Sequence, residues 1–290
     1  MRLSFACPEP NQTESQWNGR STRHILTSSD VTLNNVFMDT VMDIAPRRPI
    51  QWRLAFKALV GLAQDTARTD HVFTIISALS GNTLERTYQA FKKTAHGQRL
   101  LREKPDLMAL LSNTPWLESL PEGSLGREYL KFMNEGKLSA AGLVNAQDAG
   151  IDPNRDLDLD PARRYVADRL RDMHDLWHVL TDYGCDDTGE ITNLWFSVGQ
   201  FGNPGMAFIA LFGTIDGVAH GRIGWVRYCV RALMRGMRAA PLISEPIEEM
   251  LALPIDEARR RLRIRPTHKV HPEGIRRGYR RDGKLGALAA

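Results

Sequence analysis

The chain has 290 residues, of which 42% are hydrophobic and 25% charged, and its formal net charge is +4. This composition is typical of a soluble globular protein with one sizeable core. The three cysteines, Cys7, Cys185 and Cys229, are too widely spaced for a CxxC motif or a disulfide framework, so we expect a reducing compartment. The most apolar stretch, residues 204–215, is shorter than the about 20 residues that a membrane-spanning helix needs.

Residues 1–48 are rich in Asn, Ser, Thr and Pro and show weak periodicity, so we expect a poorly ordered lead-in with at most a short helix around residues 34–44. Pro8 and Pro10 interrupt the start too early for a secretory signal. From Trp52 onwards apolar residues recur at helical spacing, and no alternating strand pair with a hairpin turn occurs. We therefore predict a single all-α domain of seven to ten helices over residues 49–265.

A long helix is predicted over residues 161–183, because this stretch contains no internal glycine or proline and has one apolar and one charged side. Asp160 is suited to cap its N-terminus, with proline in the first turn, and Gly184 is placed to end it. In the short loop that follows, Asp187 or Thr188 could cap a second helix.

Two histidines and two carboxylates belong to this predicted helical hairpin. The first three share the helix, and the fourth follows the second histidine by twelve residues. The hairpin would bring this fourth residue back beside the preceding helix, and the loop geometry decides whether it comes level with the histidines. Histidines four apart lie on one helix face, and imidazole with carboxylate suits zinc or another divalent first-row metal. The competing interpretation is a polar helix face directed to water. The predicted metal-binding and catalytic residues are His174, Asp175, His178 and Glu190.

Other chemistries fit less well. Zinc hydrolases carry HExxH with glutamate as general base, whereas Asp175 would place its carboxylate about one methylene back. A di-iron carboxylate site needs a pair of Glu-x-x-His motifs, which is missing. Cys185 has no separate base in evidence, so we interpret it as a loop cysteine rather than a nucleophile.

The stretch from His174 to Glu190 resembles the signature of the coenzyme Q biosynthesis protein 4 family, which is HDxxH, eleven residues and then glutamate. The resemblance extends in order over about residues 50–265, and one departure is Asp182, where the family often has a small residue. The other similar blocks are LSGNTLERTYQAFKKTAHGQRLL (79–101), LPEGSLGREYLKFM (120–133), GEITNLWFSVGQFGNPGMAFIALFGTI (189–215) and PIEEMLALPIDEARRRLRI (246–264).

This resemblance implies a role in ubiquinone biosynthesis, in a helical protein that tends to dimerise and works at a membrane surface with the other enzymes of the pathway. The implied substrate is a prenylated aromatic acid derived from 4-hydroxybenzoate, and the implied reaction is an oxidative decarboxylation that replaces the carboxyl group at ring carbon 1 with hydroxyl. One divalent metal ion would assist, zinc first, with iron, cobalt or manganese as alternatives. A non-catalytic, prenyl-lipid-binding scaffold with a structural metal is the alternative.

Further residues are candidates for contacts with such a substrate. Arg127 and Tyr129 could bind the aromatic acid, although either could equally be structural. Phe201, Phe208 and Phe212 could line a groove for the isoprenoid tail. Glycines accompany these phenylalanines, and the competing interpretation there is close helix packing. The glycines are Gly199, Gly202, Gly205 and Gly213.

Residues 266–290 are predicted to form a basic tail, and basic residues begin earlier, at Arg259. Attraction to an anionic membrane surface is one interpretation and a solvated end is another. Tyr279 is its one aromatic residue, so stacking on bases is not supported and we expect no nucleic-acid partner. Because no amphipathic transit peptide is evident, we expect a cytoplasmic protein, peripheral on the inner face of a bacterial membrane, or on the matrix face of the mitochondrial inner membrane in a eukaryote.

Overall fold

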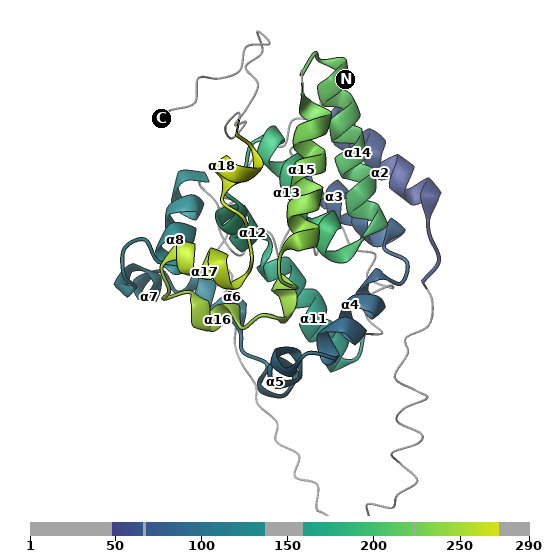
Figure 1. The fold of residues 1–290 in the computed structure, drawn as a ribbon. Helices are drawn as coiled ribbons and strands as arrows, with labels where there is room; N and C mark the ends of the chain where they lie inside the picture. The colour runs from purple at the N-terminus through teal and green to yellow at the C-terminus, as the bar shows by residue number, and fades with distance from the viewer. Residues whose placement is uncertain (1–47, 66–67, 137–158, 223, 273–290) are drawn as a thin grey trace, which may run out of the picture.

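The computed structural model describes residues 48–65, 68–136, 159–222 and 224–272, and these residues form helices and connecting loops without a β-strand (Figure 1). The predicted all-α fold class is therefore confirmed for the described part of the chain. Most of the predicted lead-in, with its short helix, lies outside the described residues, as does the tail from residue 273 onwards. The domain limits at residues 48 and 265 stay predictions.

The described residues form fifteen α-helices and one 3-10 helix, which is more than the predicted seven to ten. Ten of these helices have eight or more residues. They are α2 (Trp52–Gln64), α3 (Thr69–Leu79), α4 (Thr83–Lys92), α5 (Ala95–Glu103), α8 (Leu125–Gly136), α11 (Pro161–Asp172), α12 (His174–Thr181), α13 (Asp187–Phe201), α14 (Pro204–Ala219) and α15 (Trp225–Arg238). Shorter helices are α6 (Leu107–Ser112), α7 (Thr114–Ser119), η1 (Leu242–Ser244), α16 (Ile247–Met250), α17 (Ile255–Arg261) and α18 (Thr267–Val270).

Helix α13 lies between two apolar clusters and packs along α15 (Figure 1). Phe196 belongs to the cluster with α6, α7, α8, α12, α16 and α17, whereas Ile191 belongs to the cluster with α2, α3, α14 and α15. The crossing with α15 is close, because a Cβ atom on Gly236 would lie 2.1 Å from the Phe196 carbonyl oxygen. Helix α13 is thus fixed from both sides, and its first turn carries Glu190.

The prediction of one continuous helix over residues 161–183 was wrong. The Asp160 cap is confirmed, since its carboxylate accepts from the amides of Ala162 and Arg163, but the helix is interrupted at Met173, which lies between α11 and α12. Helix α12 then ends before the predicted Gly184, because Asp182 takes the left-handed conformation at φ 62°. Aspartate is one of the few residues other than glycine that adopts this conformation readily.

The loop between α12 and α13 is compact. Asp186 rather than Asp187 or Thr188 caps α13, and its Oδ1 accepts from the Gly189 amide at 2.7 Å. A Cβ atom on Gly189 would lie 1.7 Å from the carbonyl oxygen of Gly184, so only glycine permits this close return of the chain.

Candidate metal centre

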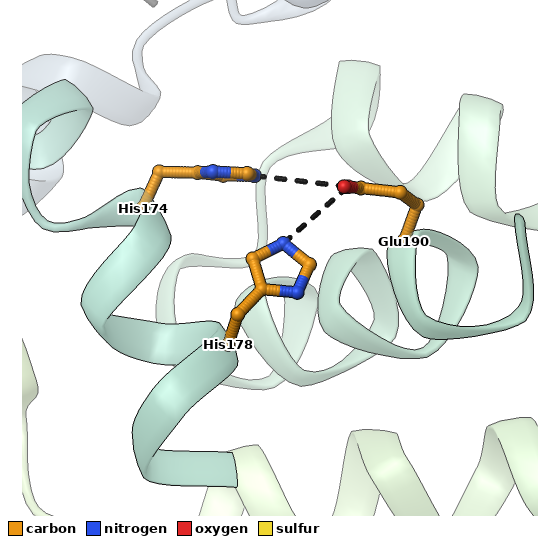
Figure 2. A group of neighbouring side chains, drawn as sticks. All are labelled: His174, His178 and Glu190. Carbon is orange, nitrogen blue, oxygen red and sulfur yellow. Dashed lines mark ion pairs between the residues drawn. The ribbon is translucent and has the colours of Figure 1, made fainter. Parts of the chain in front are cut away.

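Helices α12 and α13 bring two histidines and one glutamate together (Figure 2). The Nε2 atom of His178 lies 3.4 Å from Oε2 of Glu190, and the Nε2 atom of His174 lies 3.9 Å from the same oxygen. One ligand atom from each residue lies within 4.8 Å of the others, and this group could hold a metal ion. The predicted hairpin therefore does bring Glu190 level with the histidines.

His178 is the buried member of the group, with 1% of its surface exposed. Its Nδ1 lies 3.2 Å from the carbonyl oxygen of Tyr183, so Nδ1–H donates there and the Nε2 lone pair remains for a metal. Within the described residues, this buried Nε2 makes no hydrogen bond. A buried ring nitrogen without a hydrogen bond, facing a carboxylate, fits a metal ligand.

Asp175 lies beside the group rather than within it. Its Oδ1 is 3.0 Å from Nδ1 of His174, so the carboxylate accepts from Nδ1–H and turns Nε2 of His174 towards Glu190. Carboxylates commonly orient metal-binding histidines in this way. Asp175 differs from His174 in this respect because the two residues are adjacent, and the side chains of neighbouring helix residues point about 100° apart.

The charges of the group are coupled. Burial alone would lower the pKa of His178, but the Glu190 carboxylate outweighs burial and raises it to about 9. Burial raises the pKa of Glu190, but the His178 imidazolium lowers it by more, so the pKa of Glu190 lies below its ordinary value. Without a metal, the histidine and the glutamate therefore form an ion pair at neutral pH.

Two neighbours of His178 were not predicted as part of the site. Phe132 on α8 stacks against the imidazole with ring centroids 5.5 Å apart, and Tyr183 provides the carbonyl acceptor. Phe132 comes from the same sequence block as Tyr129, so this block held a signal that sequence reasoning did not use. Tyr129 itself is buried, and burial, followed by the charge of Asp175, raises its phenol pKa.

The other candidate substrate contacts do not gather at the metal centre. Arg127 donates from Nη1 to the carbonyl oxygen of Glu118 at 3.0 Å. Phe201 packs against Trp177 with centroids 5.2 Å apart, whereas Phe208 and Phe212 form a separate pair at 4.8 Å on α14.

The accompanying glycines allow helices and loops to pack closely. A Cβ atom on Gly199 would lie 2.4 Å from the carbonyl oxygen of Leu233, and one on Gly205 would lie 2.6 Å from the Cα atom of Ile76. Gly213 packs against a side chain of α13, and Gly202 ends α13 with a positive φ. Close packing, the competing interpretation, therefore accounts for Gly199, Gly205 and Gly213, whereas Gly202 provides the left-handed conformation that ends α13.

A cavity of about 490 Å³ opens beside His178. Its walls come from α8, α12, α17 and the loop before α13, and they include Lys131 and Arg259 as well as Phe132. Cys185, which forms no disulfide bond within the described residues, also lines it. The cavity is polar in its lining residues, and His178 connects it to the three-residue group.

Comparisons with known proteins point to one protein family. The family model described as "Coenzyme Q (ubiquinone) biosynthesis protein Coq4" matches residues 45–268. A mitochondrial ubiquinone biosynthesis protein from Rattus norvegicus is 31% identical over 235 residues, which are 80% of this chain and 85% of the relative. A mitochondrial relative from Schizosaccharomyces pombe is 27% identical over 230 residues, covering 76% and 79% of the two chains.

A crystal structure is also similar, that of a Nostoc punctiforme protein for which a role in ubiquinone biosynthesis has been proposed. The TM-score is 0.56 at 21% identity, and the match covers 75% of this chain and 98% of the other, which supports the shared fold. Since the family model matches well over half of the sequence, the chain belongs to the Coq4 family of ubiquinone biosynthesis proteins.

Proposed function

We propose that this chain catalyses a metal-dependent oxidative decarboxylation in ubiquinone biosynthesis. The substrate would be a prenylated aromatic acid derived from 4-hydroxybenzoate, and hydroxyl would replace the carboxyl group at ring carbon 1. With dioxygen as the proposed oxidant, two molecules of acid and one of dioxygen give two phenols and two molecules of carbon dioxide, which balances atoms and electrons.

The observation that carries this proposal is the buried Nε2 of His178, which makes no hydrogen bond and faces Glu190. His174, His178 and Glu190 would bind one divalent ion, zinc first, with iron, cobalt or manganese as alternatives, and Asp175 would orient His174. The bound ion would pair with the substrate carboxylate and stabilise negative charge that develops on the ring.

The protein would contribute orientation and exclusion of water. Phe132 covers one face of His178, so the imidazole that would bind the metal would keep a fixed ring plane against an apolar ring. Tyr129 and Phe201 stay proposed substrate contacts because both belong to or pack against the apolar cluster that contains α12. Arg127, Phe208 and Phe212 also remain proposals, although each contacts other elements in the described structure.

Association with a membrane surface is part of the proposal. Of the described residues, no helix is both long and apolar enough to cross a membrane. Three helices nevertheless expose apolar side chains at helical spacing. We propose that these side chains form one surface, which we call the apolar face. Its members are Ile50, Trp52, Phe56 and Val60 in or just before α2, Leu211, Ile215 and Val218 on α14, and Val226, Val230 and Met237 on α15.

The charges around the apolar face favour an anionic lipid surface as its partner. Arg53 and Lys57 on α2 and Arg227 and Arg238 on α15 are exposed, and neither helix contains an acidic residue. Each basic residue near such a surface contributes about 1 kcal/mol, and tryptophan favours the membrane interface. A second copy of the same face would bring like charges together. We therefore propose that the contacts of the homodimer and of the partner enzymes lie on other surfaces of the protein.

The test is the quinone-precursor profile, by mass spectrometry, of a strain that lacks this gene and carries wild type, His178→Ala or His220→Ala. His220 lies at the end of α14 and serves as a matched histidine control. We expect a prenylated acid that retains its ring carboxyl to accumulate with His178→Ala only. Normal quinone with His178→Ala would contradict the catalytic role and favour the scaffold, for which the variant would still co-purify with the other enzymes.

A further inference from the structure

The turn that follows α12 determines which nitrogen of His178 faces the proposed metal. The imidazole donates from Nδ1 to the Tyr183 carbonyl oxygen, so this oxygen must stay in place for Nε2 to remain the free nitrogen. The carbonyl reaches back to the ring because Asp182 takes a left-handed conformation. A non-glycine residue holds that conformation when surrounding contacts fix it.

Contacts from far along the chain fix the first residue of this turn. The carbonyl oxygen of Thr181 accepts from Nη1 of Arg235 at 2.5 Å and from Oγ1 of Thr267 at 3.3 Å. Nη2 of the same arginine donates to the carbonyl oxygen of Arg265 at 2.7 Å. One buried guanidinium of α15 thus joins the turn to the C-terminal segment that contains α18.

A second connection fixes the last residue of the turn. The hydroxyl of Tyr183 is hydrogen-bonded to Nε2 of His271 at 2.8 Å, and both side chains are almost fully buried. His271 in turn stacks on Tyr228 of α15 with ring centroids 3.8 Å apart. The Arg235 guanidinium lies over the Tyr183 ring at 5.3 Å from its centre. The tyrosine is therefore held by its ring and by its hydroxyl, directly beside the carbonyl that binds His178.

We propose that Tyr183 and His271 are positioning residues of the metal centre, which hold the turn so that His178 presents Nε2 to a divalent cation. The proposal rests on the metal site of the proposed function. The proposal gives residues 265–271 a role at the metal centre. Most of these residues were predicted to belong to a basic tail. Partners of this kind behind a histidine ligand typically change metal affinity by about 10- to 100-fold.

The experiment compares full-length Tyr183→Phe, His271→Leu and His271→Gln with wild type. Tyr165→Phe is the matched control, because Tyr165 on α11 lies outside these contacts. Zinc ion alone is the probe, its affinity is measured by competition with a chelator, and thermal unfolding is recorded in parallel. Nitrogen NMR of the zinc-loaded protein follows the Nδ1–H proton of His178.

We expect Tyr183→Phe and His271→Leu to weaken zinc binding about tenfold and to speed exchange of the His178 Nδ1–H proton with water. His271→Gln loses the ring stacking but keeps a polar partner for Tyr183. We therefore expect it to lose stability like His271→Leu and yet to retain zinc affinity near wild type. Tyr165→Phe should leave both zinc affinity and the Nδ1–H signal unchanged.

Wild-type zinc affinity with an unchanged Nδ1–H signal in Tyr183→Phe would overturn the proposal. Zinc affinity that falls only in proportion to stability, with His271→Gln as weak as His271→Leu, would also overturn it. Failure of the proposed metal site looks different, because wild type and His178→Ala would then bind zinc equally. Failure of the catalytic role alone would leave these zinc affinities unchanged and would show as normal quinone in the strain that carries His178→Ala.

Discussion

Replacing Glu190 with glutamine removes one charge from the centre and leaves the side chain almost the same size. The pKa of His178 lies at about 9, raised from its ordinary 6.5 by Glu190 against the effect of burial. This shift corresponds to about 3 kcal/mol in favour of the protonated ring. In Glu190→Gln burial remains, and only Asp175 and the Tyr183 carbonyl still oppose it, so we expect the pKa of His178 to fall well below about 9.

The sign of the pH dependence follows from these shifts. A raised pKa means that the stabilisation by His178 is fully present below about pH 6.5 and is lost as the pH rises through about 9. The lowered pKa of Glu190 means that its contribution persists above its ordinary value of 4.5 and is lost on acidification below that value. Glu190→Gln should therefore cost about 3 kcal/mol at pH 6 and much less above pH 9.

Urea unfolding with a chelator present, at pH 6 and at pH 9.5, measures this difference in the free energy of unfolding. A proton NMR titration of His178 in both proteins measures the pKa itself. A wild-type pKa near 6.5, or an equal cost of Glu190→Gln at both pH values, would refute the reasoning.

The same ion pair predicts competition between proton and metal. Below about pH 9 a metal must displace the His178 proton, so the apparent zinc affinity should rise about tenfold per pH unit between pH 6 and 8. Calorimetry in buffers with different ionisation enthalpies should detect about one proton released per zinc ion. Affinity that is independent of pH in this range would contradict the coupling.

Three further substitutions test the loop before α13, the crossing of α13 with α15, and the apolar face. Gly189→Ala places Cβ against the Gly184 carbonyl, so we expect the zinc affinity to fall and urea unfolding to show a loss of roughly 1–3 kcal/mol of stability. Unchanged zinc affinity and unchanged stability would contradict the observed contact. Gly236→Ala should cost a similar amount by separating α13 from α15, and wild-type stability would show that this crossing yields easily. Phe56→Glu should reduce co-sedimentation of the protein with anionic phospholipid vesicles more than Gln64→Glu does, because Gln64→Glu adds the same charge without removing an exposed apolar side chain. Equal reductions would exclude the apolar face as the membrane-binding surface.

Features that depend on neighbouring residues could be predicted from the sequence. The Asp160 cap is local, and the short loop before α13 made the return of Glu190 to the preceding helix predictable, whereas its position level with the histidines depends on the loop geometry. The interruption at Met173 was not predictable, because long-range contacts constrain the end of α11. Arg169 is buried there and donates to the carbonyl oxygens of Ile243 and Glu245.

The surroundings of the metal centre could not be predicted for the same reason. Phe132 precedes His178 by a long interval, and His271 follows it by another, so spacing gives no hint that Phe132 stacks on the imidazole or that His271 binds the hydroxyl of Tyr183. Asp175 was assigned as a ligand because residue type alone does not separate a ligand from a residue that orients one. Its direction on the helix, towards Nδ1 of His174, is seen only in the folded structure.

The short span of the candidate ligands has a consequence for transplantation into other scaffolds. All three lie within residues 174–190, so a peptide of this length would carry the complete ligand set. In such a peptide His178 would lose the Phe132 ring and the fixed Tyr183 carbonyl, and either ring nitrogen could then take the metal. Grafting this motif onto a helical hairpin would therefore transfer its recognisable sequence without its affinity, unless residues equivalent to those of α8, α15 and α18 were grafted with it.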